Sequence, residues 1–356
     1  MTRVRDWLLI FVDPTASNPS TYQVVAEGSV PRIRTVKNLF RAATLKTVVS
    51  LIRECETSKE LQSRDDMAKE VVEVLGDRAV AYPIFNADRT VVTAVQFWSG
   101  SLAGQIPERP LIGSWEWHTD VDEDDPAPPQ LYMDSVALDH IGMEKEHRDR
   151  TVFGPADLYT RSARLSDSLR HIRKLRALPG TLTAESSPIE AADLIISRGE
   201  VTQQLHYCER AVSDRRVQGV CWIGEAPRQE IRESMLDSWL STVLASASDM
   251  YVGVGDTSYK YPYFVKWVTE HLPGLGHGVS TGGTFALHED DFPKIVQWIS
   301  ELDDGKKVSG EVRARRGGGG YLTAKFNTVP LDPEVNPKIA LVMIQPDTSA
   351  DESENK

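Results

Sequence analysis

Two stretches of the sequence show the same order of predicted elements, and this repeat limits the fold more than any other feature. Phe153 and Asp157 align with Leu287 and Asp291 at a constant difference in residue number. After each pair comes a helical spacing of apolar residues, then two β-rich runs and a hydrophobic strand. Self-similarity of this kind is the signature of duplicated units. The sequence therefore predicts a tandem repeat of one domain type and not one large domain.

The second copy predicts a helix followed by a hairpin. Acidic residues at 289–291 suit a helix N-terminus, and apolar residues between Ile295 and Leu302 form one face of the helix. The strands 308–315 and 321–329 are separated by glycines, as in a hairpin, and 339–344 is a last strand.

The first copy predicts the same elements behind a distinctive first strand. The pattern Gly-x-Trp-x-Trp begins at Gly113, a second strand covers 131–134, and a short helix runs to Gly142. A helix over 165–178 and strands over 191–197, 203–212 and 217–223 complete the unit.

These features resemble the PAS domain family. The Gly-x-Trp-x-Trp strand carries the resemblance in the first copy, and the His-x-Asp-Asp turn at 288–291, the long hairpin and the last strand carry it in the second. The resemblance implies two PAS-like domains, each with a central antiparallel sheet. The second would open with a strand over 250–254 and a helix over 261–271.

The N-terminal part predicts a third unit of α+β class. It predicts strands over 7–13 and 23–27, helices over 35–55 and 65–75, and strands over 79–85 and 90–98. A central antiparallel sheet with helices to one side fits this order. The unit resembles a GAF domain, and 102–110 reads as a linker.

Composition limits the partners of the chain. A net charge of −12 argues against a nucleic-acid-binding surface, which needs a positive footprint. The sequence contains no apolar run of the ~18 residues that a membrane span requires, and 7–12 is too short for a signal-peptide core. We therefore expect a cytoplasmic protein without a membrane span.

Two polar motifs are candidate binding sites. Arg315, Arg316 and the glycines 317–320 could cradle phosphate, but the chain continues as a strand where a phosphate loop needs a helix, so a hairpin turn is favoured. The cluster from His288 to Asp291 carries metal-ligand atoms, but consecutive residues on a turn diverge, so helix capping is favoured. Gly253 to Asp256 is interpreted as a strand end and turn rather than a dinucleotide site.

The cysteines and tryptophans are interpreted as core residues. A hairpin turning at 213–216 would place Cys208 directly opposite Cys221, where a redox switch is the alternative to two buried thiols. Cys55 completes an odd set without zinc-site spacing. Six tryptophans lie on apolar faces and fit a core better than a cofactor site: Trp115, Trp117, Trp222, Trp239, Trp267 and Trp298.

A strongly amphipathic helix is predicted over 228–244, between the two copies. It can dock within the chain or pair with its counterpart in another subunit, which would make a homodimer. The polar, acidic tail after residue 346 is predicted to be disordered.

The predicted domains are 1–108, 109–226 and 227–346, followed by the tail 347–356. A GAF-like and two PAS-like units without an effector module are similar to the actinobacterial, including mycobacterial, triple-sensor-domain family. That resemblance implies a non-enzymatic sensor that binds small-molecule or protein signals and serves as a scaffold for an unidentified signalling protein. An enzyme with a site assembled from distant residues and a ligand-free structural protein are the alternatives.

No residue is assigned to catalysis, to a metal or to a cofactor. The chain has no Asn-Cys-Arg-Phe motif for a flavin, no His that can be placed against a haem, and no Gly-x-Ser-x-Gly elbow.

Overall fold

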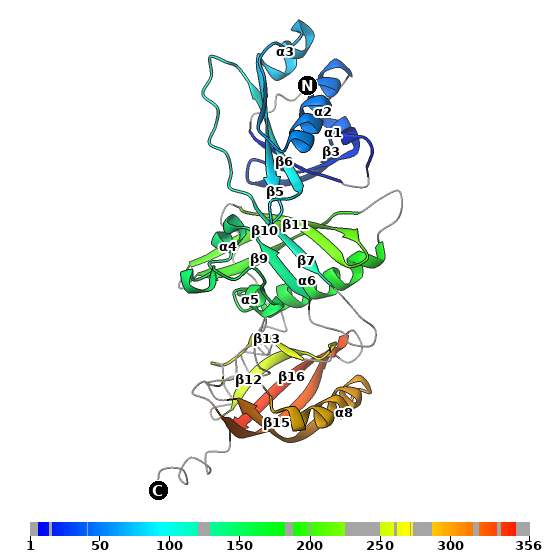
Figure 1. Cartoon of the computed structure of the whole chain (residues 1–356), viewed down its shortest axis with the longest axis vertical. Coiled ribbons are helices and arrows are strands. Elements are labelled where there is room, and N and C mark those ends of the chain that lie inside the picture. The colour runs from blue at the N-terminus through cyan, green and yellow to red at the C-terminus, as the bar shows by residue number, and fades with distance from the viewer. Residues whose placement is uncertain are drawn as a thin grey trace. The chain divides into compact units, whose positions relative to one another are not determined.

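The computed structural model describes most of the 356-residue chain. The described residues are 6–13, 16–40, 42–119, 129–181, 188–198, 201–224, 250–259, 262–270, 272, 287–315, 320–332 and 336–346. They form three antiparallel sheets accompanied by helices, which confirms the predicted α+β class (Figure 1). The predicted helix over 228–244 and the tail 347–356 lie outside these residues.

By its internal contacts the chain divides into two compact units. The first unit holds the first two sheets, and the second holds the third sheet together with residues 152–169. The predicted domain boundaries remain a prediction. No helix in the described part of the chain is long and apolar enough to cross a membrane.

The first sheet has six strands in the order β3-β2-β1-β6-β5-β4. The strands are β1 (Leu8–Phe11), β2 (Gln23–Glu27), β3 (Val30–Thr35), β4 (Gln62–Arg64), β5 (Arg78–Phe85) and β6 (Val92–Gly100). The helical segments are η1 (Pro19–Thr21), α1 (Val36–Leu39), α2 (Ala42–Ser58) and α3 (Lys69–Leu75). The sequence pattern missed β3 and β4, the two edge strands, because β3 is largely exposed and β4 is three residues long.

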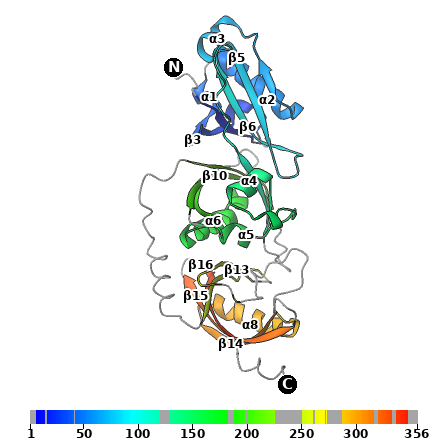
Figure 2. The same ribbon diagram turned by 90° about the vertical axis from the view of Figure 1, so that its left-hand side faces the viewer.

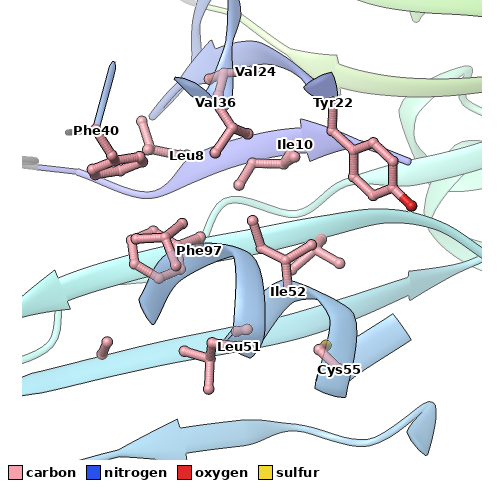
Figure 3. Packing of buried hydrophobic residues seen from close by; sticks show 14 of the residues in the cluster. Leu8, Ile10, Tyr22, Val24, Val36, Phe40, Leu51, Ile52, Cys55 and Phe97 are labelled. Atoms are coloured by element: carbon pink, nitrogen blue, oxygen red, sulfur yellow. The ribbon is translucent and has the colours of Figure 1, made fainter. Parts of the chain in front are cut away.

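Helix α2 packs its apolar side against one face of the first sheet. Figure 3 shows its Leu51, Ile52 and Cys55 facing Ile10 and Phe97 of the sheet. The alternate residues of β1, Leu9 and Phe11, belong to a second buried cluster that also contains Cys208 and Trp222 of the second sheet. Strand β1 is therefore apolar at every position because both of its faces are covered.

The second sheet has the order β8-β7-β11-β10-β9. Its strands are β7 (Gly113–His118), β8 (Gln130–Met133), β9 (Glu190–Arg198), β10 (Val201–Ser213) and β11 (Arg216–Ile223). The helical segments of this part of the chain are α4 (Ser135–His140), η2 (Lys145–His147), α5 (Pro155–Tyr159), α6 (Leu165–Ala177) and η3 (Leu178–Thr181).

The third sheet repeats this topology in the order β13-β12-β16-β15-β14. Its strands are β12 (Tyr251–Asp256), β13 (Tyr263–Trp267), β14 (Val308–Arg315), β15 (Tyr321–Asp332) and β16 (Asn336–Pro346). Helix α8 (Phe292–Asp303) follows η4 (Glu289–Asp291) in the chain and lies on one face of the sheet (Figure 2). In both sheets the first strand pairs with the second and the fifth, so the described elements agree with the predicted repeat.

The prediction of a helix over 261–271 is wrong. The structure forms strand β13 there, and Tyr263, Val265 and Trp267 are buried at alternate positions. A period of two with aromatic and β-branched residues is the signature of a strand, and pairing with β12 decides the outcome.

The prediction that Cys208 and Cys221 lie directly opposite each other is also wrong. A shift in register between Ala211 and Ser213 pairs Cys208 with Val220 and Cys221 with Tyr207. Because neighbouring residues of a strand point to opposite faces, a one-residue shift separates the two thiols across the sheet.

We predict that all three cysteines are unreactive in the native protein. Each is a buried free thiol, and burial raises the pKa of Cys55 and of Cys208 to about 12. A pKa near 12 leaves roughly one thiol in ten thousand ionised at pH 8. Labelling with a thiol-specific reagent should be negligible in buffer and complete in guanidinium chloride. Rapid labelling of Cys208 or Cys221 without denaturant would contradict this assignment.

Candidate functional site

The core of the second sheet is filled by a buried polar cluster. Both carboxylate oxygens of Glu209 on β10 lie 2.9 to 3.0 Å from Nε2 of His171 on α6. The indole Nε1 atoms of Trp115 and Trp117 on β7 donate to Oε1 of the same carboxylate at 2.8 and 3.1 Å. All four side chains are completely buried. The carboxylate is thus surrounded by nitrogen partners, as a buried charge requires.

The sequence favours this cluster through alternation and one glycine. Trp115 and Trp117 stand two residues apart on β7, so their indoles share one face of the sheet. Gly219 on β11 pairs with both Trp115 and Glu209. A Cβ atom at Gly219 would lie 2.1 Å from Nε1 of Trp115 and 2.9 Å from Cγ of Glu209. The absence of a side chain there lets the tryptophan reach the carboxylate.

The first strand of the third sheet carries glycines where the second sheet carries these tryptophans. Gly253 and Gly255 occupy alternate positions in the interior of β12, which occupies the place of β7 in the repeated topology. A Cβ atom at Gly253 would lie 2.6 Å from the ring of Phe264, whereas one at Gly255 would meet Val342 at an ordinary 3.4 Å. The interpretation of Gly253 to Asp256 as a strand end and turn is wrong in placing a turn there, because β12 runs to Asp256, two residues beyond the predicted strand over 250–254.

An apolar cavity of about 110 Å³ lies between α8 and the third sheet. Gly255, Phe264, Phe326 and Val342 are among its sheet residues, and Phe292, Ile295, Trp298, Ile299 and Leu302 line it from α8. Where bulky indoles fill the second sheet's core, the strand with two glycines leaves space.

The cavity wall offers few polar groups. Among the described residues that line it, Thr257, Tyr263 and Thr328 carry hydroxyls, and none carries a carboxylate, amine, guanidinium, imidazole or thiol. Two of these hydroxyls are already donated within the protein, from Thr257 to the carbonyl oxygen of Lys338 at 2.9 Å and from Tyr263 to Oδ2 of Asp256 at 3.0 Å. The arrangement suits binding by shape and apolar contact.

Trp298, which is half-buried, forms part of the cavity wall on the side of α8. Its indole packs over Gly310 on β14, where a Cβ atom would lie 2.2 Å from the ring. Gly310 therefore fixes how closely α8 approaches the edge of the sheet.

The motifs considered from the sequence do not converge on this cavity. Strands β14 and β15 pair with Arg315 opposite Tyr321, and Arg316 with the glycines 317–319 lies outside the described residues. His288 accepts a weak bond from the backbone N–H of Asp290 at 3.3 Å. Asp291 differs from the predicted cap, because its carboxylate accepts bonds from the backbone and guanidinium of Arg313 at 2.8 and 3.2 Å. These bonds hold the turn at 288–291 against β14.

The tryptophans divide between core and cavity. Trp115, Trp117 and Trp222 are core residues, Trp267 is buried beside Phe264, and Trp298 lines the cavity. Trp239 lies outside the described residues. Across the described residues, no group of three or more His, Cys, Asp or Glu side chains is placed to hold a metal ion.

A wider depression of about 740 Å³ in the first unit is a weaker candidate. Its wall includes Arg109 and Arg148, which look suited to an anion. However, Arg148 already binds Asp139 and the carbonyl oxygen of Met143, and Arg109 donates to Gln96 and lies over the ring of Tyr82. Much of its basic character is used within the fold.

One family model matches the N-terminal part of the chain. Residues 6–108 match the family described as Rv3651-like, N-terminal. No curated protein matches the chain.

Among solved structures, the chain is similar to an uncharacterised protein from Mycobacterium tuberculosis at 18% identity, with 97% of each chain covered and a TM-score of 0.66. This likeness extends to the fold of nearly the whole chain. An RNA-binding light-oxygen-voltage receptor matches at 11% identity over 66% of this chain and 95% of that one, with a TM-score of 0.25. A LOV protein of Rhodobacter sphaeroides matches at 15% identity over 33% and 72%, with a TM-score of 0.24.

We predict that the buried carboxylate of Glu209 stabilises the second sheet's core. The substitution Glu209→Gln replaces an acceptor oxygen with an amide NH₂ and leaves a buried N–H group without its acceptor. The expected loss is about 1–3 kcal/mol of unfolding free energy, measured by urea denaturation with tryptophan fluorescence. Asp214→Asn is the control, because that side chain is 86% exposed in the β10–β11 hairpin, and should change stability by less than about 0.5 kcal/mol. Equal effects of the two substitutions would contradict the assignment.

Proposed function

We propose that the protein is a non-enzymatic sensor whose third sheet binds a small molecule. The observation that carries this proposal is the cavity beneath α8, at a place in the repeated topology that the second sheet fills with Trp115, Trp117, Glu209 and His171. One copy of the repeat is then a packed scaffold, and the other is the binding module.

The chemistry of the cavity wall supports binding over catalysis. General acid–base and nucleophilic steps need an ionisable or nucleophilic side chain within hydrogen-bond reach of the substrate. The only ionisable or nucleophilic groups on the described lining are hydroxyls, and the phenol of Tyr263 is held by Asp256. An uncharged apolar wall can hold a molecule but has few means to transform it.

Sensing requires that binding change something a partner can read. Helix α8 supplies five of the residues that line the cavity, so occupation would act directly on the packing between this helix and the sheet. We further propose that the segment 228–244, predicted to be amphipathic, carries the change to an unidentified signalling protein or to a second copy of the chain. A change transmitted in this way requires the ligand to favour one arrangement of α8 over another.

The proposal predicts that a side chain at Gly255 abolishes ligand binding. A Cβ atom is accommodated there, so the isobutyl group of Gly255→Leu should occupy the cavity without preventing folding. In thermal melts with a library of small molecules, ligands at one hundred times their Kd should stabilise the wild type by about 2.7 kcal/mol and leave the variant unchanged.

Gly180→Leu is the matched control for this experiment. Its Cβ would meet no atom within 4 Å, so the same group is added away from the cavity. Ligands should stabilise this control as they stabilise the wild type. Stabilisation of Gly255→Leu to the same extent would place binding elsewhere and overturn the proposed function.

A further inference from the structure

We infer that the ligand of the third sheet is an uncharged, apolar molecule about the size of one aromatic ring. This inference rests on the proposed function and adds the chemical class of the ligand. Three properties of the cavity carry it: its volume, the electrostatics of its wall and the aromatic side chains around it.

The volume sets the size. The cavity holds about 110 Å³. An apolar cavity of roughly 150 Å³ stays dry and takes benzene or xenon, whereas sites for drug-sized ligands run from about 300 to 1,000 Å³. A cavity of the observed size fits one ring or a short branched hydrocarbon and is too small for a fused-ring cofactor or a nucleotide.

The wall sets the charge. An ion moved from water into an apolar site needs an opposite charge or several hydrogen bonds to replace its hydration. The described lining supplies no charged side chain, and the nearby carboxylate of Asp256 is already bonded to Tyr263 and to the backbone N–H of Ser258 at 3.0 Å. A carboxylate or ammonium ligand would therefore lose far more on entry than it gains.

One hydroxyl is left to donate to the ligand. Thr257 and Tyr263 donate within the protein, which leaves Thr328 on β15 as the remaining hydroxyl of the described lining. A ligand can thus carry one small polar group directed at β15. A molecule with several such groups would leave some of them unpaired, which is costly in an apolar site.

Aromatic side chains favour a ring over an aliphatic chain. Phe264, Phe292, Trp298 and Phe326 all line the cavity, and they come from two strands of the sheet and from the start and the middle of α8. Aromatic pairs add stabilisation beyond the area they bury, through offset or edge-to-face contact. The wall surrounds the ligand with such partners.

A titration series on the full chain tests the ligand class. Isothermal titration calorimetry with benzene, toluene, para-xylene, phenol and benzoate should show binding of benzene and toluene, with a negative heat-capacity change, and benzoate weaker by at least about a hundredfold. Phenol should bind through Thr328, and Thr328→Val should weaken phenol relative to toluene by about tenfold, because the two side chains have nearly the same shape.

Two variants at Gly255 keep this test decisive. Gly255→Leu should abolish binding of every probe, and Gly255→Ala, whose single methyl is accommodated, should weaken para-xylene more than benzene. Benzoate binding as tightly as toluene and lost in Gly255→Leu would overturn the ligand class and leave the proposed function standing. If none of the probes binds, the inferred ligand class is overturned. If the probes bind and neither variant changes their affinity, both the ligand class and the proposed function are overturned.

Discussion

The difference between the second and third sheets depends on which residues occupy two alternate positions in the first strand of each sheet. In β7 these positions hold Trp115 and Trp117, and their indoles need an acceptor because a buried N–H without a partner is costly. Glu209 supplies that acceptor and itself needs the donors, since a buried carboxylate is tolerated only when it is paired. Both oxygens of the carboxylate also lie within hydrogen-bond distance of Nε2 of His171 on α6. The elements of this core therefore depend on one another.

In β12 the same positions hold Gly253 and Gly255, and the described residues form no such network around them. The glycine at 253 allows the ring of Phe264 to lie across the strand, and the glycine at 255 lines the cavity, where a Cβ atom would meet Val342 at an ordinary contact distance of 3.4 Å. Most of the described side chains that line this cavity are apolar. Protein interiors are close-packed, so a void lined by carbon atoms forfeits contacts that a ligand would restore. This contrast is the physical basis of the proposed binding by the third sheet.

Much of the fold follows from the pattern of the sequence, but the site does not. Periodicity located most strands and the long helices, and the aligned turns at Asp157 and Asp291 revealed the repeat. Periodicity failed for β13, whose aromatic residues fit two spacings, and for Cys208, where one shifted residue reversed the face. Neither outcome is visible without knowing the pairing of the strands.

The cavity depends on residues that are distant in the chain and are brought together by strand pairing. The partnership of Trp115 with Glu209 and His171 has the same character. The sequence nevertheless contains one indication of the cavity. When the Gly-x-Trp-x-Trp strand is aligned with the Gly-Val-Gly of β12, two tryptophans align with two glycines. That comparison becomes meaningful once the two strands are known to occupy the same place in their sheets.

Xenon binding gives the most direct test of the contrast between the two sheets. Xenon is an uncharged, polarisable atom that enters apolar cavities without needing a hydrogen bond. A crystal structure of the full chain under xenon pressure should show an atom between α8 and the third sheet, near Gly255, and none among Trp115, Trp117 and Glu209. Xenon in the second sheet's core with an empty third sheet would contradict the account.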